Sequence, residues 1–364
     1  MSILYIMETN QTNLQPLPLS FDVESKEVFR KAIEANRQLA ELKGVVRTIP
    51  NATILINTLI LQEAKDSSAI ENIITTHDEL FKADLFSELL SRETKEVMSY
   101  ASALRKGFEL VKEHGFISNK FILEIQAELE HNRAGFRKVP GTALKNEQTG
   151  QVIYTPPQDY DTIVSLMGNL EKYINENNAT DPDPLVKMAI IHFQFESIHP
   201  FYDGNGRTGR IINILYLTMK GLLDLPILYL SRYIIQHKAD YYRLLQEVRT
   251  KGSWEEWVLY MLDGVADTAK ETIGLIGQIR QLMDDYKHEI RAQFPRIYSK
   301  DLLENLFKHP YTKIDYLQND LGVSYLTARK YLETLNEANF LKKYQLGKYN
   351  IYINEPLFNL FVNR

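Results

Sequence analysis

Apolar residues recur every three to four positions over most of the chain, which is the spacing of helices with one buried face. Between residues 25 and 46 this spacing predicts a helix that buries Phe29, Ile33, Leu39, Leu42 and Val46. Further helices are predicted at 52–65, 93–113, 119–130, 160–175, 184–196, 208–221, 240–249, 253–262 and 266–294. Glycine and proline are sparse, at 17 and 13 residues, so few of these segments are interrupted. The pattern therefore predicts an all-α protein.

Residues 143–157 depart from the helical spacing. Two short extended runs, 143–145 and 152–154, flank a turn at 147–150 that contains Gly150. Extended runs around such a turn predict a β-hairpin. The pattern alone fits a plain structural hairpin and a hairpin that contacts a ligand equally well.

The last segment of the chain predicts a small separate domain. Helical spacing at 299–308, 312–320 and 325–338 is followed by alternating runs at 340–344 and 349–353. This order is that of a winged helix-turn-helix domain, in which the third helix would carry Tyr325, Thr327, Arg329 and Lys330. Residues 299–364 hold nine basic and seven acidic side chains, which is a weak positive charge for a DNA-binding domain. A docking or dimerisation module is therefore an equal alternative.

These patterns predict four parts of the chain: an N-terminal arm and helix at 1–50, a helical domain at 51–265, a connecting helix at 266–295 and the small domain at 296–364.

The composition excludes several classes of protein. The 364 residues are 44% hydrophobic and 24% charged, with a net charge of −5, which is typical of a soluble globular protein. The absence of cysteine excludes a disulfide scaffold, a zinc–thiolate finger, an iron–sulfur cluster and a cysteine nucleophile. No apolar run is long enough to span a bilayer, and no basic residue precedes the apolar start of the chain. We expect no membrane partner and a cytoplasmic location.

The strongest chemical signal lies between Ser197 and Arg210, in the sequence SIHPFYDGNGRTGR. Gly204 and Gly206 flank Asn205 where helical spacing begins, so successive backbone N–H groups can surround an anion at a helix N-terminus. Arg207 and Arg210 are three residues apart and share one helical face. Their planar guanidinium groups suit phosphate oxygens.

Two more side chains complete this phosphate-transfer site. Asp203 can hold Mg²⁺, which favours one carboxylate together with phosphate oxygens. His199 can accept the proton of an attacking hydroxyl if its imidazole is neutral. Taken singly, a histidine or an Asp-Gly-Asn-Gly turn is usually structural. Their coincidence within twelve residues favours a site.

The segment His199–Arg210 matches the signature His-x-Phe-x-(Asp/Glu)-Gly-Asn-Gly-Arg-x-x-Arg at every fixed position. The chain therefore resembles the Fic-domain protein adenylyltransferases over residues 50–262. The resemblance implies a helical Fic fold with a small β-hairpin, and transfer of AMP from ATP to a serine, threonine or tyrosine hydroxyl of a target protein. The phosphotransferase branch of the superfamily has lysine at the position of Gly206, so this glycine favours nucleotidyl transfer.

The resemblance also implies a role for each residue of the segment. His199 would be the general base, Asp203 the Mg²⁺ ligand and Phe201 the anchor of the loop in the core. The residues that would bind ATP are Gly204, Asn205 and Gly206 at the α- and β-phosphates, Arg207 as their support, Thr208 and Gly209 beside them, and Arg210 at the γ-phosphate.

Two features outside this segment fit the same resemblance. The hairpin at 143–157 is similar to the family's flap, on which a target would dock as an added strand. Val152, Ile153 and Tyr154 would then cover the nucleotide. Tyr241 and Tyr242 resemble a tyrosine pair that lines the adenosine pocket, and core packing is the alternative for them.

Ser67, Glu71 and Asn72 fill the fixed positions of the Fic inhibitory motif (Ser/Thr)-x-x-x-Glu-(Gly/Asn). We expect a helix break at 66–68, with Ser67 or Ser68 capping a following helix that carries Glu71. The motif implies that Glu71 inhibits the enzyme by pairing with Arg210 in place of the γ-phosphate. A capped helix with an exposed glutamate is the alternative.

Two functions remain open at this stage. One is a self-inhibited protein adenylyltransferase that uses ATP and Mg²⁺, modifies a target protein or itself, and forms a homo-oligomer. The other is a nucleotide-sensing, DNA-binding transcriptional regulator with little or no turnover. The intact His199 favours the enzyme, and weak DNA binding by the small domain is compatible with both.

Overall fold

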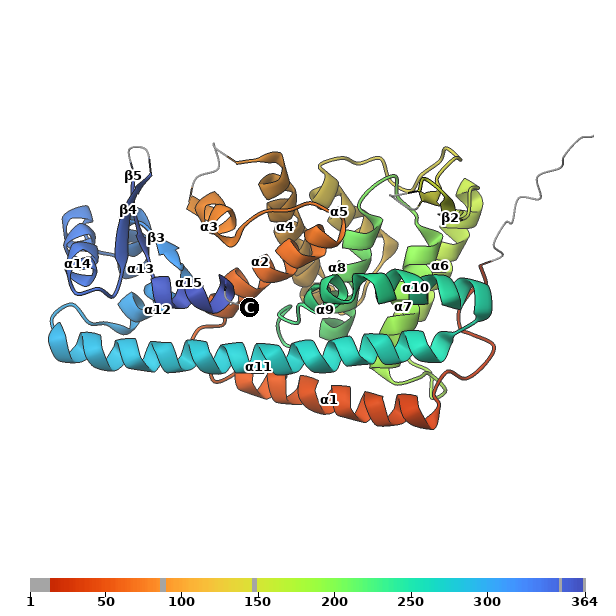
Figure 1. Ribbon diagram of the computed structural model, residues 1–364, viewed down its shortest axis with the longest axis horizontal. Helices are drawn as coiled ribbons and strands as arrows, with labels where there is room; N and C mark the ends of the chain where they lie inside the picture. The colour runs from red at the N-terminus through yellow and green to blue at the C-terminus, as the bar shows by residue number, and fades with distance from the viewer. Residues whose placement is uncertain (1–13, 86–89, 146–148, 347–348, 363–364) are drawn as a thin grey trace, which may run out of the picture. The chain divides into compact units, whose positions relative to one another are not determined.

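The computed structural model describes residues 14–85, 90–145, 149–346 and 349–362. It is mainly helical (Figure 1) and divides into two compact units that interleave along the chain. The first unit contains Met1–Asn36, Ser102–Gly221 and Gln236–Gly264. The second contains Arg37–Ala101, Leu222–Ile235 and Val265–Arg364.

Most of the predicted helices form at or near their expected positions, and the bounds of α5 and α6 are those expected. The helices of the first half are α1 (Lys26–Val46), α2 (Ala52–Ile70), α3 (His77–Leu85), α4 (Arg92–His114), α5 (Asn119–Glu130) and α6 (Tyr160–Asn175). The remaining helices are α7 (Pro184–Ile198), α8 (Asn205–Met219), α9 (Leu230–Gln236), α10 (Lys238–Lys251), α11 (Trp254–Gln293), α12 (Lys300–Lys308), α13 (Ile314–Leu321), α14 (Tyr325–Glu337) and α15 (Glu355–Val362).

The predicted hairpin is present as the antiparallel strands β1 (Leu144–Lys145) and β2 (Val152–Tyr154). Leu144 pairs with Tyr154 and Lys145 with Val152, so the register shifts by one residue between the two pairs. Glu147 and Gln148 of the expected turn lie outside the described residues.

The buried face of α1 differs from the one we expected. Leu39, Leu42 and Val46 are buried, but Phe29 and Ile33 are 51% and 69% exposed. Val28, Ala32 and Ala35 are buried in their place. These three positions continue the stripe of Leu39 and Leu42 along one helix face, and the two larger side chains lie off it.

Two helix boundaries also differ from expectation. The expected break at 66–68 is wrong, because α2 continues to Ile70 and neither Ser67 nor Ser68 caps a following helix. The two helices expected at 253–262 and 266–294 are one continuous helix, α11. No glycine-rich or proline-containing turn separates them, and apolar spacing alone did not join them.

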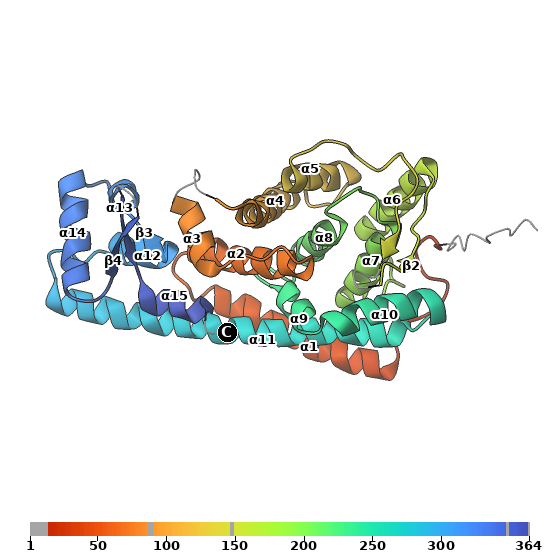
Figure 2. The ribbon, with the colours of Figure 1, turned by 45° about the horizontal axis from the view of Figure 1, so that its top comes forward.

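The centre of the first unit is α7, in which every residue from Leu185 to Ile198 is buried. In two views α8 runs beside it (Figures 1 and 2). Gly209 allows this close approach, since a Cβ atom there would lie 2.7 Å from Oε1 of Glu196 and 3.1 Å from the ring of Phe195. Because the two helices pack tightly against each other, the C-terminus of α7 and the N-terminus of α8 are held in place.

The small domain has the predicted order of helices and hairpin, with an added strand, β3, and an added helix, α15, after the hairpin. The hairpin consists of β4 (Lys342–Leu346) and β5 (Tyr349–Ile353), and β3 (Tyr311–Thr312) pairs with β5 in the sheet order β3-β5-β4. Ser324 caps α14 as predicted, because its Oγ accepts a hydrogen bond from the Thr327 N–H at 3.2 Å. Among the described residues, no helix combines the length and the apolar character needed to cross a bilayer.

Candidate active site

His199 occupies the C-cap of α7 in the left-handed conformation, with φ of 49°. Its N–H donates to the carbonyl of Phe195 at 3.0 Å, which closes the last helical turn. The chain then turns back and starts α8 after Gly204, which is also left-handed, with φ of 74°. Two left-handed residues therefore bracket the loop that holds the predicted catalytic residues.

The loop is held from within by Asn205. Its side-chain oxygen accepts from the Phe201 N–H at 2.8 Å, and its amide nitrogen donates to the Phe201 carbonyl at 2.9 Å. Phe201 itself is fully buried against the rings of Phe136 and Phe195. Asn205 therefore shapes the loop with its side chain, and its backbone N–H remains at the start of α8.

The N-terminus of α8 suits an anion. No side chain caps it, and Thr208 in its first turns has a buried Oγ1 without a hydrogen-bond partner among the described residues. Uncapped N–H groups and the positive end of the helix dipole attract phosphate oxygens. These features fit the triphosphate that the sequence predicts here.

Arg207 and Arg210 are both buried in this region. An Nη2 of Arg207 lies 2.9 Å from a carboxylate oxygen of Glu130, at the end of α5, and 3.8 Å from Asp203. Glu130 also approaches Gly204 so closely that a Cβ atom there would lie 2.4 Å from Oε1. Glu130 was not singled out from the sequence, since it lies far from the motif along the chain.

Asp203 is the acidic residue of the loop, and 76% of its side chain is accessible. One carboxylate oxygen accepts from the Gly204 N–H at 2.7 Å, which turns the side chain toward the start of α8. A single exposed carboxylate beside an anion site suits Mg²⁺, which takes its remaining ligands from phosphate and water.

The imidazole of His199 is held in its neutral form. Burial lowers its pKa to about 4, assisted by the positive charges of Arg137 and Arg249, whereas a hydrogen bond with the Glu196 backbone and the charge of Asp203 oppose the shift. Nδ1 is buried away from solvent. A neutral imidazole can accept a proton at physiological pH, and Nε2 is the nitrogen left to face a substrate.

Arg137, which the sequence analysis did not single out, fastens the turn at His199. Its Nε donates to the His199 carbonyl at 2.8 Å, and its backbone N–H donates to the Pro200 carbonyl at 2.8 Å. An Nη2 donates to the carbonyl of Pro157, just after the hairpin. Because its partners are backbone carbonyls, no sequence motif marks this residue.

The hairpin is fastened to the same place through Tyr154. Its hydroxyl donates to the Ser197 carbonyl at 2.8 Å, and the guanidinium of Arg249 lies 3.9 Å from its ring centre. Val152 and Ile153 remain about half exposed. Of the three residues expected to cover the nucleotide, the structure therefore buries one and leaves two accessible.

The two tyrosines of α10 lie in different environments. Tyr242 is 49% exposed, whereas Tyr241 is buried and its hydroxyl lies 2.8 Å from Nε2 of His192. Asn213 of α8 donates to Nδ1 of the same histidine at 3.1 Å. Tyr241 therefore belongs to a polar network in the core that links α7, α8 and α10, as the alternative of core packing anticipated.

The segment of the inhibitory motif belongs to the second unit, where Glu71 is the C-cap of α2. Asn72 follows in the left-handed conformation, with φ of 63°. The N–H of Asn72 bonds the Ala69 carbonyl at 3.0 Å, and that of Ile73 bonds the Ser68 carbonyl at 3.1 Å. This pair of bonds is a Schellman motif, which explains why glycine or asparagine suits the position after the glutamate.

Comparison with known proteins adds to this geometry. The model of the Fic/DOC family matches residues 116–217, and that of its N-terminal region matches residues 29–109. The C-terminal domain of SoFic-like protein adenylyltransferases matches residues 282–357. The three matches together include both the candidate loop and the small domain.

Curated relatives are similar over part of their length. The protein adenylyltransferase Fic of Aedes aegypti is 28% identical over 184 residues, which are 50% of this chain and 34% of that protein. A probable protein adenylyltransferase of Aquifex aeolicus is 30% identical over 185 residues, which are 49% of this chain and 54% of that protein. The chain thus spans between a third and about half of these two relatives.

Solved structures show the same fold. A Fic family protein from Desulfovibrio desulfuricans G20 aligns with a TM-score of 0.58 at 21% identity, over 93% of this chain and 98% of that one. Fic-1 from C. elegans aligns with a TM-score of 0.54 at 23% identity, over 69% of this chain and 74% of that one. With the signature loop, the hairpin and the helical fold in agreement, the chain belongs to the Fic/DOC family.

Proposed function

We propose that the protein transfers AMP from ATP to a hydroxyl side chain of a target protein. The observation that carries this proposal is a neutral His199, fixed in a left-handed turn directly before the uncapped N-terminus of α8. A base beside an anion site is the arrangement that nucleotidyl transfer requires.

In the proposed reaction the target hydroxyl oxygen attacks the α-phosphorus of ATP. A bond forms between these two atoms, the bond from the α-phosphorus to the bridging oxygen breaks, and pyrophosphate leaves. Nε2 of His199 takes the hydroxyl proton. The backbone N–H groups at the start of α8, with Arg207 and Arg210, hold the phosphate oxygens. Asp203 would hold Mg²⁺, which supplies charge neutralisation on the phosphates when bound.

The test uses ATP labelled either at the α- or at the γ-phosphate. We expect label from the α-position alone to appear on protein, and His199→Ala to lower its rate by about 10²–10⁴-fold. His114→Ala, at the end of α4, is the matched control. Label from the γ-position would indicate a kinase. A protein that binds ATP without transferring label would instead support the nucleotide-sensing regulator.

We further propose that Glu71 inhibits this activity by pairing with Arg210 at the place of the γ-phosphate. A carboxylate and a guanidinium form a strong bidentate pair, and the carboxylate would repel the triphosphate. The helix-end geometry of Glu71 and Asn72 supports this reading, since a Schellman motif gives the glutamate a fixed place at the end of α2.

Two substitutions test this inhibition. Glu71→Gly should raise the rate of α-label transfer, and Glu71→Gln should do the same while it alters only the charge. Glu176→Gly, at the C-cap of α6, is the matched control and should leave the rate unchanged. The double variant Glu71→Gly with His199→Ala should be inactive. If both Glu71 variants transferred the α-label at the wild-type rate, Glu71 would have only a structural role at the end of α2.

A further inference from the structure

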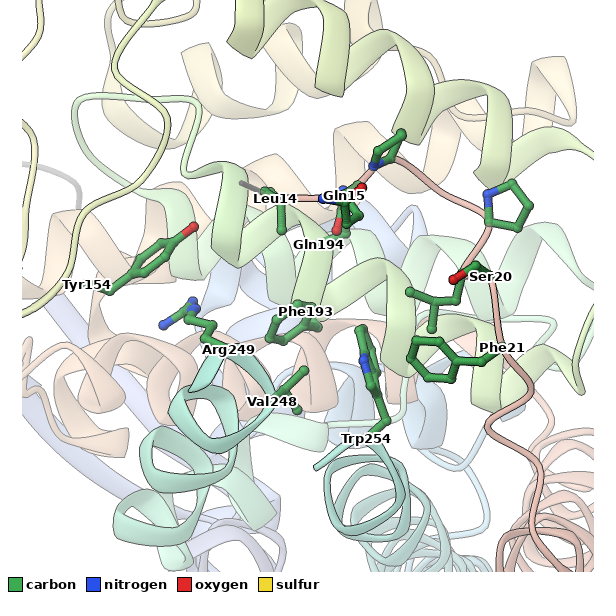
Figure 3. Close-up of a pocket in the computed structure, with 13 residues that line it drawn as sticks. Leu14, Gln15, Ser20, Phe21, Tyr154, Phe193, Gln194, Val248, Arg249 and Trp254 are labelled. Atoms are coloured by element: carbon green, nitrogen blue, oxygen red, sulfur yellow. The ribbon is translucent and has the colours of Figure 1, made fainter. Parts of the chain in front are cut away.

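A cavity of about 460 Å³ lies in the first unit, and none of its lining residues belongs to α8. The chain segment 14–21 forms one wall, and residues of β2, α7, α10 and α11 form the others. Figure 3 shows Tyr154 and Arg249 at one end, with Phe21 and Trp254 at the other. The volume falls in the range of small-molecule sites.

The wall formed by the N-terminal segment is fastened to the helices. The backbone of Leu17 exchanges two hydrogen bonds with the side-chain amide of Asn169, at 2.7 and 2.8 Å. Gln194 donates to the carbonyl of Gln15 at 2.9 Å, and the ring of Phe21 meets that of Trp254 edge to face. These contacts hold the N-terminal segment in place, so that it forms a defined wall of the cavity.

The lining is apolar and aromatic with one charge. Phe21, Tyr154, Phe193 and Trp254 supply four aromatic rings, and no lining residue is acidic. The single charged group is the guanidinium of Arg249. The cavity therefore has a positive charge at one end and mainly apolar walls elsewhere.

Arg249 has no carboxylate within ion-pair distance among the described residues. Its Nε donates to the hydroxyl of Ser197 at 3.3 Å, and its guanidinium faces the rings of Tyr154 and Phe193. Burial lowers the pKa of this arginine, and the negative charge of Glu196 acts in the opposite direction without forming an ion pair with it. A largely buried cation without a carboxylate in direct contact is costly, and the aromatic contacts offset only part of that cost. The guanidinium can therefore accept a further anion as a direct partner.

We propose that this cavity binds a small monocarboxylate with an apolar body, whose carboxylate pairs with Arg249 and whose body lies against Phe193 and Trp254. The two Nη groups of Arg249 can donate to both carboxylate oxygens, and the aromatic walls take up the apolar part. The inference does not rest on the proposed adenylyl transfer, although Tyr154 and Arg249 also contact Ser197 near the end of α7.

Binding can be measured on the full chain with labelled octanoate by equilibrium dialysis, together with tryptophan fluorescence, to which Trp254 and Trp257 contribute. We expect saturable binding at one site, and Arg249→Met should raise the Kd by about tenfold or more, since a hydrogen-bonded charge contributes at this level. Arg249→Lys should retain part of the affinity. Arg243→Met, also on α10 but exposed, should leave the Kd unchanged. Octanol should bind about tenfold or more weakly than octanoate, because it lacks the charge.

A second variant protects the test against misfolding of the Arg249 substitutions. Ser20→Trp fills the cavity from the exposed N-terminal segment and should raise the Kd for octanoate while the circular dichroism spectrum is unchanged. Octanoate binding that is equal in the wild type, Arg249→Met and Ser20→Trp would overturn the proposal. Competitive displacement of octanoate by a non-hydrolysable ATP analogue would also overturn it, because the cavity would then be part of the nucleotide site.

Discussion

The Nε atom of Arg137 donates a hydrogen bond to the backbone carbonyl of His199 across 62 residues of sequence, at 2.8 Å. This bond holds the general base of the proposed reaction in a left-handed turn that a non-glycine residue rarely adopts. The same arginine bonds the carbonyl of Pro157 after the hairpin. One buried side chain therefore ties the catalytic turn to the hairpin exit.

Arg137→Met should lower the rate of adenylyl transfer about 10²-fold, because a small misplacement of a catalytic group has an effect of this size. It should also destabilise the protein, since the carbonyls of His199 and Pro157 lose their donor, at about 1–3 kcal/mol for each buried unpaired group. Initial rates and urea unfolding measure the two effects. Arg133→Met, an exposed neighbour, is the control, and equal rates in the two variants would contradict the role of Arg137.

The rate of the reaction should stay nearly constant from pH 8 down to about 5.5 at subsaturating ATP. The base acts when neutral, and burial lowers the pKa of His199 to about 4, so protonation begins only well below neutral pH. A histidine with the ordinary pKa of about 6.5 would lose about tenfold by pH 5.5. The pH profile of kcat/KM distinguishes the two, because it reports the free enzyme.

Gly204→Ala should remove nearly all activity, whereas Gly252→Ala should not. Both glycines are left-handed, with φ of 74° and 72°, so each alanine adds about 1–2 kcal/mol of backbone strain. Only at Gly204 would the new Cβ meet a neighbour, at 2.4 Å from Oε1 of Glu130, which must then leave Arg207. Transfer rates and unfolding curves of the two variants test this difference. Similar loss of activity in both would point to strain alone.

The free energy of unfolding should fall as the pH falls from about 6.5 toward 4. Burial lowers the pKa of His77 and His199 to about 4 and that of His192 to about 3. In the unfolded chain these groups titrate near 6.5, so the unfolded state binds more protons in this window. Each such histidine contributes a slope of up to about 1.4 kcal/mol per pH unit.

The variant His77→Gln removes the titrating group of His77 alone. In the wild type, Nε2 of His77 lies 2.9 Å from Oε1 of Gln62. A glutamine at this position can still donate a hydrogen bond to that oxygen. We expect a smaller pH slope of stability in this variant than in His288→Gln, which alters an exposed position of α11. Urea unfolding between pH 7.5 and 5 measures both slopes. Equal slopes would show that His77 does not stay neutral on folding.

The small domain should bind duplex DNA weakly and only at low salt. Lys343 pairs with Glu333 at 2.6 Å and Lys342 with Glu355 at 3.1 Å, so these two cations of the hairpin are already neutralised. Arg329 and Lys330 on the exposed face of α14 remain for phosphates. In the full chain, Arg329→Glu with Lys330→Glu should abolish retention at 50 mM salt, while Arg92→Glu should not. Binding that persists unchanged at high salt would exclude this electrostatic mode.

Local sequence signals predicted the elements around the site well. The bounds of α5 and α6 agree with the expected ranges because both have a capping side chain, from Ser118 and Asp159, and a regular apolar stripe. The loop from His199 to Arg210 was identified because glycine, carboxylate, imidazole and guanidinium groups follow one another in the chain. Short elements such as α3, α9, α15 and β3 offered too few residues for a periodic pattern.

Contacts between distant segments could not be predicted in the same way. Arg137 and Glu130 contact the segment His199–Arg210 through a backbone carbonyl and a buried ion pair. Arg249 stacks on Tyr154 of the hairpin. None of these partners is near in sequence. The burial of Tyr241 has the same origin, because its neighbours His192 and Trp257 come from other helices. The sequence shows which side chains are present, but the contacts between distant side chains depend on how the helices pack.

Because His199 is the residue that closes α7, its direction depends on how many residues that helix contains. One residue inserted within α7 would rotate the histidine by about 100° and move it by about 1.5 Å along the axis. The buried surroundings of α7 leave no room to absorb such a change, whereas the exposed segment 177–180 before it could take up extra residues. Over evolutionary time, insertions and deletions should therefore accumulate in that segment, and the length of α7 should be inherited without change.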